Sequence, residues 1–162
     1  ELGPEGAAAL APAIAVSASL TRVDIHFNAI AGDGASQLSV AVLGNSNIEV
    51  FNEIPIKEMR ADSFTELHLN EKYIGVEGGM VVAGLLPVMA SVTDVNLSDN
   101  NLTGGKYVKQ NKLSGSTFKA GDRVMHEGQE LTILKEKDSD GDVLLGSLDG
   151  VMALAVAYNM LT

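Results

Sequence analysis

The sequence predicts an α/β protein in which units of one strand and one helix stack into a curved solenoid with a parallel sheet, interrupted by a small antiparallel β insert. Two observations predict the solenoid. Residues 2–30 align without a gap on residues 74–102 with ten identities over 29 positions, and each copy changes from helical to alternating periodicity at the same point. A third observation predicts the insert, because residues 118–149 contain three short apolar stretches separated by Glu-Gly and Asp-rich turns.

The first half of each copy is predicted to be a helix that begins near a Gly-x-x-Gly pair, since Ala, Leu, Val and Ile follow at helical spacing. The most apolar of these helices, residues 79–92, is shorter than the roughly 20 residues that a bilayer crossing needs, and Pro87 interrupts it. We therefore interpret it as a repeat helix and expect no membrane span. The paired glycines mark the start of each repeat, so they are not interpreted as a phosphate-binding loop.

The second half of each copy is predicted to be a short strand followed by a turn. Its pattern is L-x-x-L-x-L-x-x-N-x-L, with Asn28 and Asn100 at the same place in the two copies. A third version begins at Phe64 and has Lys72 in place of Asn, and a weaker fourth version begins at Ile48 and is broken by Pro55. The four versions begin at Leu20, Ile48, Phe64 and Val92, so two steps of 28 residues flank one of 16.

These motifs resemble the leucine-rich repeat family, and within it the long repeats of the ribonuclease-inhibitor type. The resemblance covers roughly residues 2–105 and implies a leucine-rich repeat solenoid over 1–105. It also implies that Asn28 and Asn100 are structural, bonding backbone groups of the neighbouring turn. Lys72 and residues 48–63 depart from the pattern, so we do not expect the solenoid to curve regularly in that part of the chain.

The second part of the chain differs in charge and periodicity. Residues 1–105 carry 13 acidic and 4 basic side chains, whereas residues 106–117 contain three lysines and no acid, and are predicted to be a basic linker. Residues 118–149 resemble small SH3-like β-barrel modules, and we expect this insert to depend on the solenoid because its core would be small. Residues 150–162 return to the composition of the repeat helices.

Composition excludes several functional classes. The formal charge of −10 disfavours duplex nucleic acid and anionic lipid as partners. The chain has no cysteine, which excludes disulfides, thiolate nucleophiles and cysteine-based zinc sites and favours an intracellular, cytoplasmic location. A chain that begins at Glu1 is interpreted as a fragment or a processed form.

Candidate metal sites are weak. Asp138, Asp140 and Asp142 have the spacing of the first calcium ligands of an EF-hand, but Val143 stands where that loop needs glycine, and a polar hairpin turn is the favoured interpretation. The three histidines, His26, His68 and His126, lack the pattern of a zinc site. We expect no cofactor, and no Ser/His/Asp arrangement is fixed by the sequence.

The resemblance implies a concave face that binds other proteins. Its side chains flank the strand apolars and are rich in acids, so a partner with basic or amide groups is expected: Arg22, Asp24, His26, Glu66, His68, Asn70, Asp94, Asn96 and Ser98. The sequence therefore predicts a protein-interaction scaffold without catalytic activity.

Three alternatives remain open at this point. The first is a solvated face without a partner. The second is a GTPase-activating or hydrolase-inhibiting regulator of the same repeat type. In the third, the β insert recognises an acidic peptide or single-stranded nucleic acid through its basic residues, which are Lys106, Lys109, Lys112, Lys119 and Arg123.

Overall fold

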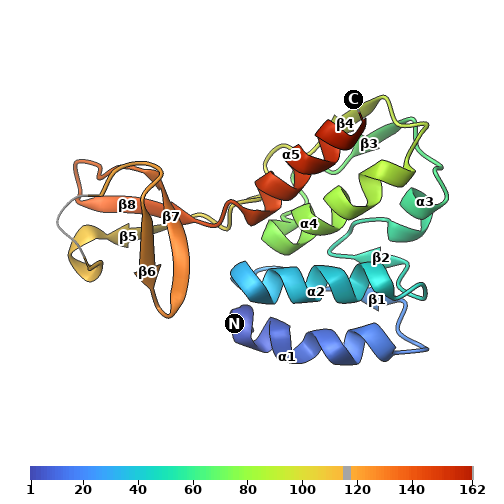
Figure 1. Ribbon diagram of the computed structural model, residues 1–162, viewed down its shortest axis with the longest axis horizontal. Coiled ribbons are helices and arrows are strands. Elements are labelled where there is room, and N and C mark those ends of the chain that lie inside the picture. Colours follow the sequence, from blue (N-terminus) through green and yellow to red (C-terminus); the bar gives the residue numbers. More distant parts are fainter. Residues whose placement is uncertain (115–117, 162) are drawn as a thin grey trace.

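Four helices form one layer of the molecule. The computed structural model describes residues 1–114 and 118–161, and in it α1 (Gly3–Val16), α2 (Gly32–Gly44), α4 (Gly75–Leu85) and α5 (Asp149–Leu161) lie side by side in that order (Figure 1). Short strands lie behind this layer. A separate β unit stands at one end of it and is joined to it by two extended segments.

The short strands form two separate parallel pairs. β1 (Arg22–Val23) pairs with β2 (Val50–Phe51), and β3 (Glu66–His68) pairs with β4 (Asp94–Asn96). In both pairs the partner residues are 28 positions apart, as with Arg22 and Val50, which is the long step in the sequence.

The predicted leucine-rich repeat solenoid with a curved parallel sheet is wrong, because the strands do not form a continuous parallel sheet. In the described residues the two pairs are separate two-stranded sheets, and no pairing joins β2 to β3. The 16-residue step explains the break. After Phe51 the chain folds back in an antiparallel bridge to Ile54, and Pro55 leads into the short helix α3 (Ile56–Arg60). This connection is too short for a full crossover helix.

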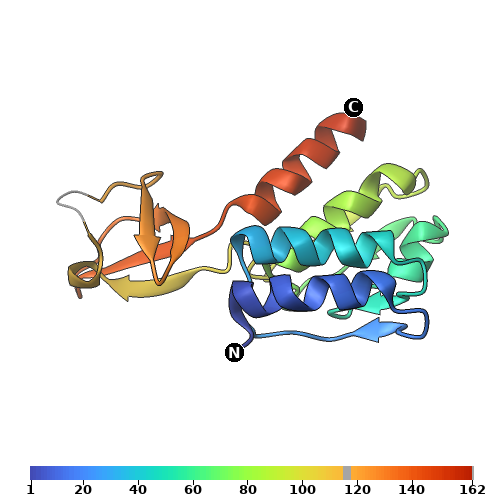
Figure 2. The same cartoon turned by 60° about the horizontal axis from the view of Figure 1, so that its bottom comes forward.

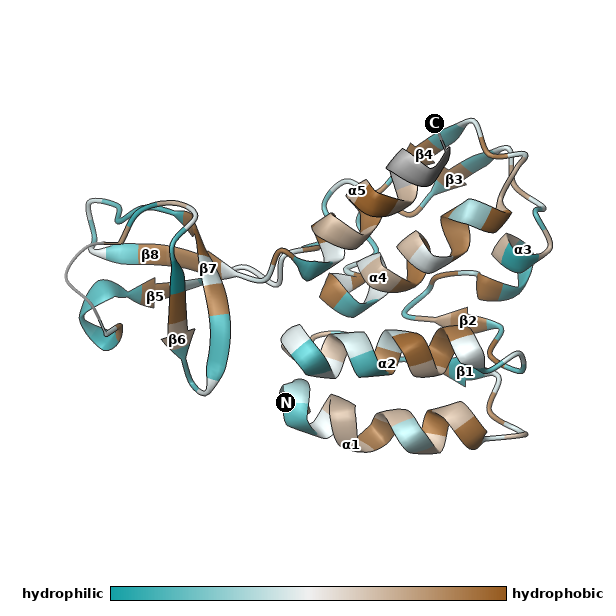
Figure 3. Cartoon of the chain, viewed as in Figure 1, coloured by the Kyte–Doolittle hydropathy of each residue, from teal (hydrophilic) through white to brown (hydrophobic). Residues whose placement is uncertain are grey.

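The core lies between the helix layer and the strands. Apolar residues run along the helices (Figure 3), and their buried side chains form one cluster with those of the irregular segment 48–59. The segment contributes Ile48, Phe51, Ile54, Ile56 and Met59, all fully buried. The segment that breaks the sheet is therefore a fully buried part of the core.

The apolar run near the middle of the chain divides into two helical pieces. α4 ends at Leu85, and a single 3-10 turn at Leu86–Val88 follows because Pro87 cannot continue an α-helix. None of the helices in residues 1–114 and 118–161 combines the length and the apolar character that a bilayer crossing requires.

The β unit is a four-stranded antiparallel sheet with its own core. The strand order is β5-β8-β7-β6, formed by β5 (Lys106–Lys109), β6 (Arg123–His126), β7 (Gln129–Lys135) and β8 (Asp142–Gly146). Part of the predicted basic linker is therefore the edge strand β5, followed by a 3-10 turn at Gln110–Lys112. No pairing in the described residues joins the edges β5 and β6, so the sheet is open and does not close into the predicted SH3-like barrel.

The insert has an apolar core of its own, whereas the sequence predicts that it depends on the larger part. Its buried apolar side chains form a cluster distinct from that of the helix layer: Val108, Leu113, Val124, Leu131, Ile133, Val143 and Leu145. Residues 115–117 of the predicted linker and Thr162 of the predicted C-terminal helix lie outside the described residues.

The insert leaves and rejoins the helix layer at one point (Figure 2). The Ser147 backbone N–H donates a hydrogen bond of 2.7 Å to the Thr103 carbonyl oxygen, which ties the two connecting segments together. The chain then enters α5, which packs on α4. Gly150 permits this close approach, because a Cβ there would lie 3.0 Å from the Val76 carbonyl oxygen of α4 and 2.8 Å from the Leu102 carbonyl oxygen.

A similar close approach fixes the spacing of α1 and α2. A Cβ on Gly34 would lie 2.6 Å from Pro4 Cα and closer still to the Pro4 carbonyl oxygen, so Gly34→Ala would push α1 away. We expect this change to lower the free energy of unfolding by about 2 kcal/mol in urea denaturation. Gly44→Ala is the matched control, because that Cβ would meet nothing within 4 Å in the same helix. Equal unfolding midpoints for the two variants would contradict this account.

Candidate protein-binding surface

The exposed polar side chains of the parallel strands form one surface. We call it the strand face and define it by the outward side chains of β1, β3 and β4 and of the residue after β1: Arg22, Asp24, Glu66, His68, Asp94 and Asn96. Alternation of side chains along β1 and β3 puts Val23 and Leu67 in the core and their neighbours outside, whereas in β4 the intervening Val95 is 39% exposed. The strand face therefore carries three carboxylates and one arginine.

Two of these carboxylates are direct neighbours. Glu66 and Asp94 are opposite partners in the β3–β4 register, and their side chains are 66% and 62% exposed. His68 lies beside both, with its Nε2 3.3 Å from Asp94 Oδ1 and 3.9 Å from Glu66 Oε2. Like charges opposite each other in a sheet repel. This arrangement favours the approach of a cationic group.

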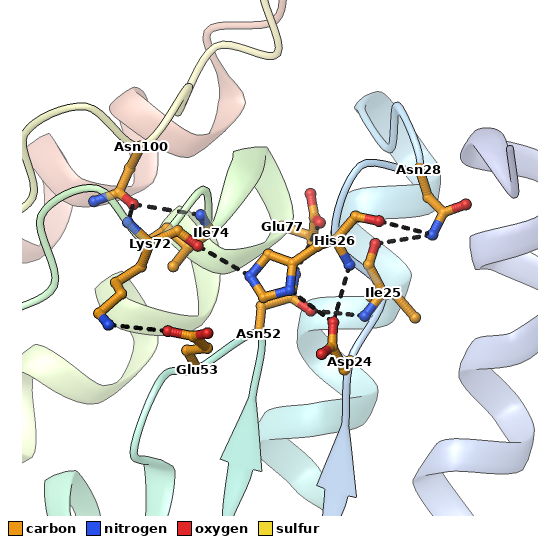
Figure 4. A network of polar contacts seen from close by, with 10 residues as sticks. All are labelled: Asp24, Ile25, His26, Asn28, Asn52, Glu53, Lys72, Ile74, Glu77 and Asn100. Carbon is orange, nitrogen blue, oxygen red and sulfur yellow. Dashed lines mark hydrogen bonds and ion pairs between the residues drawn. The ribbon is translucent and has the colours of Figure 1, made fainter.

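A polar network connects the end of β1 to the loop after β3 (Figure 4). The Asp24 carboxylate lies 2.6 Å from His26 Nδ1, and His26 Nε2 lies 3.0 Å from the Lys72 carbonyl oxygen. The hydrogen bond with His26 holds the pKa of Asp24 below its usual value. Both ring nitrogens face oxygen acceptors, and the ring is only 13% exposed. His26 is thus a connector between two loops, and not the exposed contact residue that the sequence predicts.

A second network lies beneath the first and is buried. Asn52 accepts a hydrogen bond of 2.9 Å from the Ile25 N–H through Oδ1 and donates one of 3.1 Å to Glu77 Oε1. Burial raises the pKa of the Glu77 carboxyl to about 7, although the hydrogen bonds from its own backbone N–H and from Asn52, and the nearby His26, partly oppose this shift. Glu77 therefore titrates near neutral pH from a position that is only 5% exposed.

The two repeat asparagines bond backbone groups across neighbouring turns. Asn100 is buried, accepts from the N–H groups of Lys72 and Ile74, and donates to the carbonyl oxygen of Leu69 at 2.6 Å. Asn28 is half-buried and accepts from the Leu2 N–H at 2.8 Å. Both serve the backbone, so neither is available to a ligand.

The remaining predicted contact residues differ in exposure. Ser98 is exposed, and its hydroxyl and N–H both donate to the side-chain oxygen of Asn96. Asn70 is half-buried in the loop after β3. The structure thus brings Glu66, His68 and Asp94 into direct proximity and places Ser98 and Asn70 beyond the strands.

Two exposed aromatic side chains lie next to the strand face. Phe27 and Tyr73 are 75% and 56% exposed, and their ring centroids are 5.4 Å apart. They come from different loops, one after β1 and the other after β3. His26 lies beside Phe27 with a centroid separation of 5.9 Å. We call Phe27 and Tyr73 the aromatic pair.

The basic residues of the insert are largely neutralised. Lys106 pairs with Glu127 at 2.8 Å, and Arg123 pairs with Glu130 at 3.0 Å. Lys109 contacts Asp142 Oδ2 and the Asp140 carbonyl oxygen, both at 2.9 Å. These pairs weaken the case for an acidic ligand on the insert.

The aspartates of the predicted weak calcium site shape a turn. Asp138 Oδ1 accepts the backbone N–H groups of Asp140 and Asp142, and these bonds hold the Asp138 pKa below its usual value. Asp142 is also paired with Lys109, which supplies a cation from the chain itself. In the part of the chain that the structure describes, no group of three His, Asp or Glu side chains is arranged to hold a metal ion.

Comparison with known proteins found no match. No family model matches the chain, and no curated protein or solved structure matches it. Functional inference therefore depends on the geometry of the site.

Sequence reasoning missed Asn52, Glu77 and the aromatic pair. Asn52 lies outside the repeat register of Asn28 and Asn100, so no periodic signal identified it. Glu77 stands within a strongly apolar run, and this context could have indicated its burial. Phe27 and Tyr73 occupy turn positions where polar residues are usual, which is a signal that the sequence does contain.

Proposed function

We propose that this chain is a non-catalytic protein-interaction module that binds a basic partner protein through the strand face. The observation that carries the proposal is the pair Glu66 and Asp94, two exposed carboxylates placed opposite each other in adjacent strands. A lysine or arginine of a partner would relieve their repulsion and gain two charged hydrogen bonds. Asp24 extends the negative potential toward β1.

The geometry favours recognition over chemistry. His68 and its two carboxylates are all more than half exposed, so solvent screens their interaction. In the Asp24–His26 pair, the two ring nitrogens of His26 face Asp24 Oδ1 and the Lys72 carbonyl oxygen, and neither of these groups is a hydroxyl or thiol nucleophile. We also propose that the protein is intracellular and cytoplasmic. We further propose that its strand and asparagine pattern is related to that of leucine-rich repeats.

The proposal predicts that charge reversal on the strand face abolishes capture of the partner. A variant carrying Asp24→Lys, Glu66→Lys and Asp94→Lys should retain less than about a tenth of the partner that the unchanged chain captures from native cell extract, since three attractive charges become repulsive. Affinity capture followed by mass spectrometry measures this loss, and circular dichroism checks that both chains are folded.

The matched control reverses three carboxylates elsewhere. Glu5→Lys, Glu58→Lys and Glu136→Lys change the net charge equally, and all three side chains are exposed and lie on α1, on α3 and in the insert, not on the parallel strands. Capture should persist in this variant. If both variants lose the partner to the same extent, the interaction depends on overall charge and the strand face is not the binding site.

A further inference from the structure

The aromatic pair occupies positions where the backbone disfavours large side chains. Phe27 and Tyr73 have φ angles of 59° and 52°, in the left-handed region. Asn, Asp and Gly tolerate this conformation, whereas bulky residues adopt it at a cost. Each side chain also exposes an apolar ring to water. Neither feature stabilises the free chain.

The same turn recurs elsewhere in the molecule with different residues. The turn after β4 has positive φ at Asp99 (58°) and Asn101 (49°), which correspond in the repeat to Phe27 and Tyr73 respectively. The fold therefore accepts small polar residues at both positions. The equivalent positions carry Glu71 (φ 58°) and Ala29 (φ 50°) in the other copies, so the turn needs an aromatic side chain at neither position, which indicates a role outside folding.

The polar network holds the two rings together. His26 precedes Phe27, and its Nε2 contacts the carbonyl oxygen of Lys72, which precedes Tyr73. Asp24 fixes His26 from the other side at 2.6 Å. The loops that carry the aromatic pair are thus joined before any partner binds, so little conformational entropy is lost in forming the platform.

The surroundings of the aromatic pair are acidic. Glu71 and Glu53 lie in the neighbouring turns, and the one lysine there, Lys72, is paired with Glu53 at 3.0 Å. Asp24 connects this region to the strand face. Aromatic faces attract cations, and the planar guanidinium of arginine can stack on a ring while its N–H groups reach carboxylates.

We propose that the aromatic pair is the anchoring site for an arginine side chain in an extended segment of the partner protein. This inference rests on the proposed function and adds to it a position and a residue type. The guanidinium stacks against the rings of Phe27 and Tyr73, and the flanking segment runs across the strand face toward Glu66 and Asp94.

The test uses synthetic peptides and the full chain. A fluorescein-labelled peptide of alternating Gly and Arg residues is titrated at physiological ionic strength and followed by fluorescence anisotropy, together with Gly-Lys and Gly-Glu peptides of equal length. We expect the arginine peptide to bind, the lysine peptide to bind at least about threefold more weakly, and the glutamate peptide not to bind. NMR spectra of the aromatic side chains should show the largest shifts at Phe27 and Tyr73.

The variants are chosen so that they fold. Phe27→Asn and Tyr73→Asn introduce asparagine, which tolerates positive φ, at these two positions. The thermal unfolding midpoints of the two variants should therefore be no lower than that of the unchanged chain. Each variant should lower the affinity for the arginine peptide at least about tenfold. Tyr107→Asn is the matched control, because Tyr107 is 61% exposed but lies on β5 of the insert. It should leave the affinity unchanged.

The outcomes separate this inference from the proposed function. Binding that survives both Asn variants, or no binding of the arginine peptide, overturns the aromatic anchor. If binding survives both Asn variants but is lost with Asp24→Asn, Glu66→Gln and Asp94→Asn, the strand face is the site without the aromatic pair. If the Asn variants lose binding and the neutral strand-face variant keeps it, the aromatic anchor stands and the strand-face proposal fails.

Discussion

Replacement of Asn100 by alanine should lower the free energy of unfolding by about 3 to 5 kcal/mol, because a buried polar group left without a partner costs about 1 to 3 kcal/mol. The Asn100 side chain joins two consecutive turns, since it bonds Lys72, Ile74 and Leu69 in one turn and Leu97 and Ser98 in its own. Alanine would leave several of these groups unpaired where water cannot replace the amide. Urea denaturation followed by circular dichroism measures the change.

Two other asparagines provide controls for this prediction. Asn28 occupies the same place in the first copy but is half-buried and has fewer partners, so Asn28→Ala should cost about 1 to 2 kcal/mol. Asn111 is exposed in the insert, and Asn111→Ala should have little effect. A loss at Asn100 no larger than that at Asn28 would contradict the account based on burial.

The second large effect concerns pH. Burial raises the pKa of Glu77 from its ordinary value of 4.5 to about 7, so between these values the folded chain binds a proton that the unfolded chain has released. Stability linked to this group is therefore fully present below pH 4.5 and falls as the pH rises toward 7 and above. The total loss is about 3 kcal/mol, since each pKa unit corresponds to about 1.4 kcal/mol.

Glu77→Gln isolates this contribution. Glutamine keeps the shape and the acceptor that Asn52 Nδ2 uses, but it carries no charge at any pH. We expect the variant and the unchanged chain to have similar stability at pH 4.5, and the variant to be more stable by about 3 kcal/mol at pH 8. Denaturant unfolding at a series of pH values gives the difference curve between the two chains. A flat difference curve would show that Glu77 ionises normally in the folded chain.

The sequence could predict those helices and strands that show a clear local periodicity of apolar residues. Three short apolar stretches separated by turns predict strands within residues 118–149, and the structure has β6, β7 and β8 in this range. Helical spacing likewise predicts a helix from the second Gly-x-x-Gly pair, where α4 begins at Gly75. Such patterns reflect which face of a helix or strand is buried, and the spacing of apolar residues in the sequence indicates that face.

The parts that failed depend on contacts between elements. Whether β2 and β3 pair is decided by the path of residues 51–60, where Pro55 and the Phe51–Ile54 bridge send the chain into α3. A repeat pattern does not specify such a path. Lys106–Lys109 likewise reads as a charged linker, yet pairing with β8 makes it a strand. Tertiary pairing overrides local composition in both cases.

The candidate site was predictable only as a list of exposed strand residues. The alternation around Leu67 places Glu66 and His68 outside, but only the register reveals that Asp94 lies opposite Glu66. His26 has the same residue type as His68 and a different role, because the Lys72 carbonyl oxygen and Asp24 enclose it. Charge and periodicity identify such a surface, whereas its internal bonds require the structure.

The bond between Thr103 and Ser147 has a consequence for the order in which the chain can assemble. α5 is far from α4 in sequence, and closing a free loop of this length carries an entropic cost that grows with the logarithm of its length. A folded insert brings Thr103 and Ser147 within 2.7 Å of each other and removes most of that loop from the search. The insert, which has its own core, thereby converts the distant contact between α4 and α5 into an effectively local one.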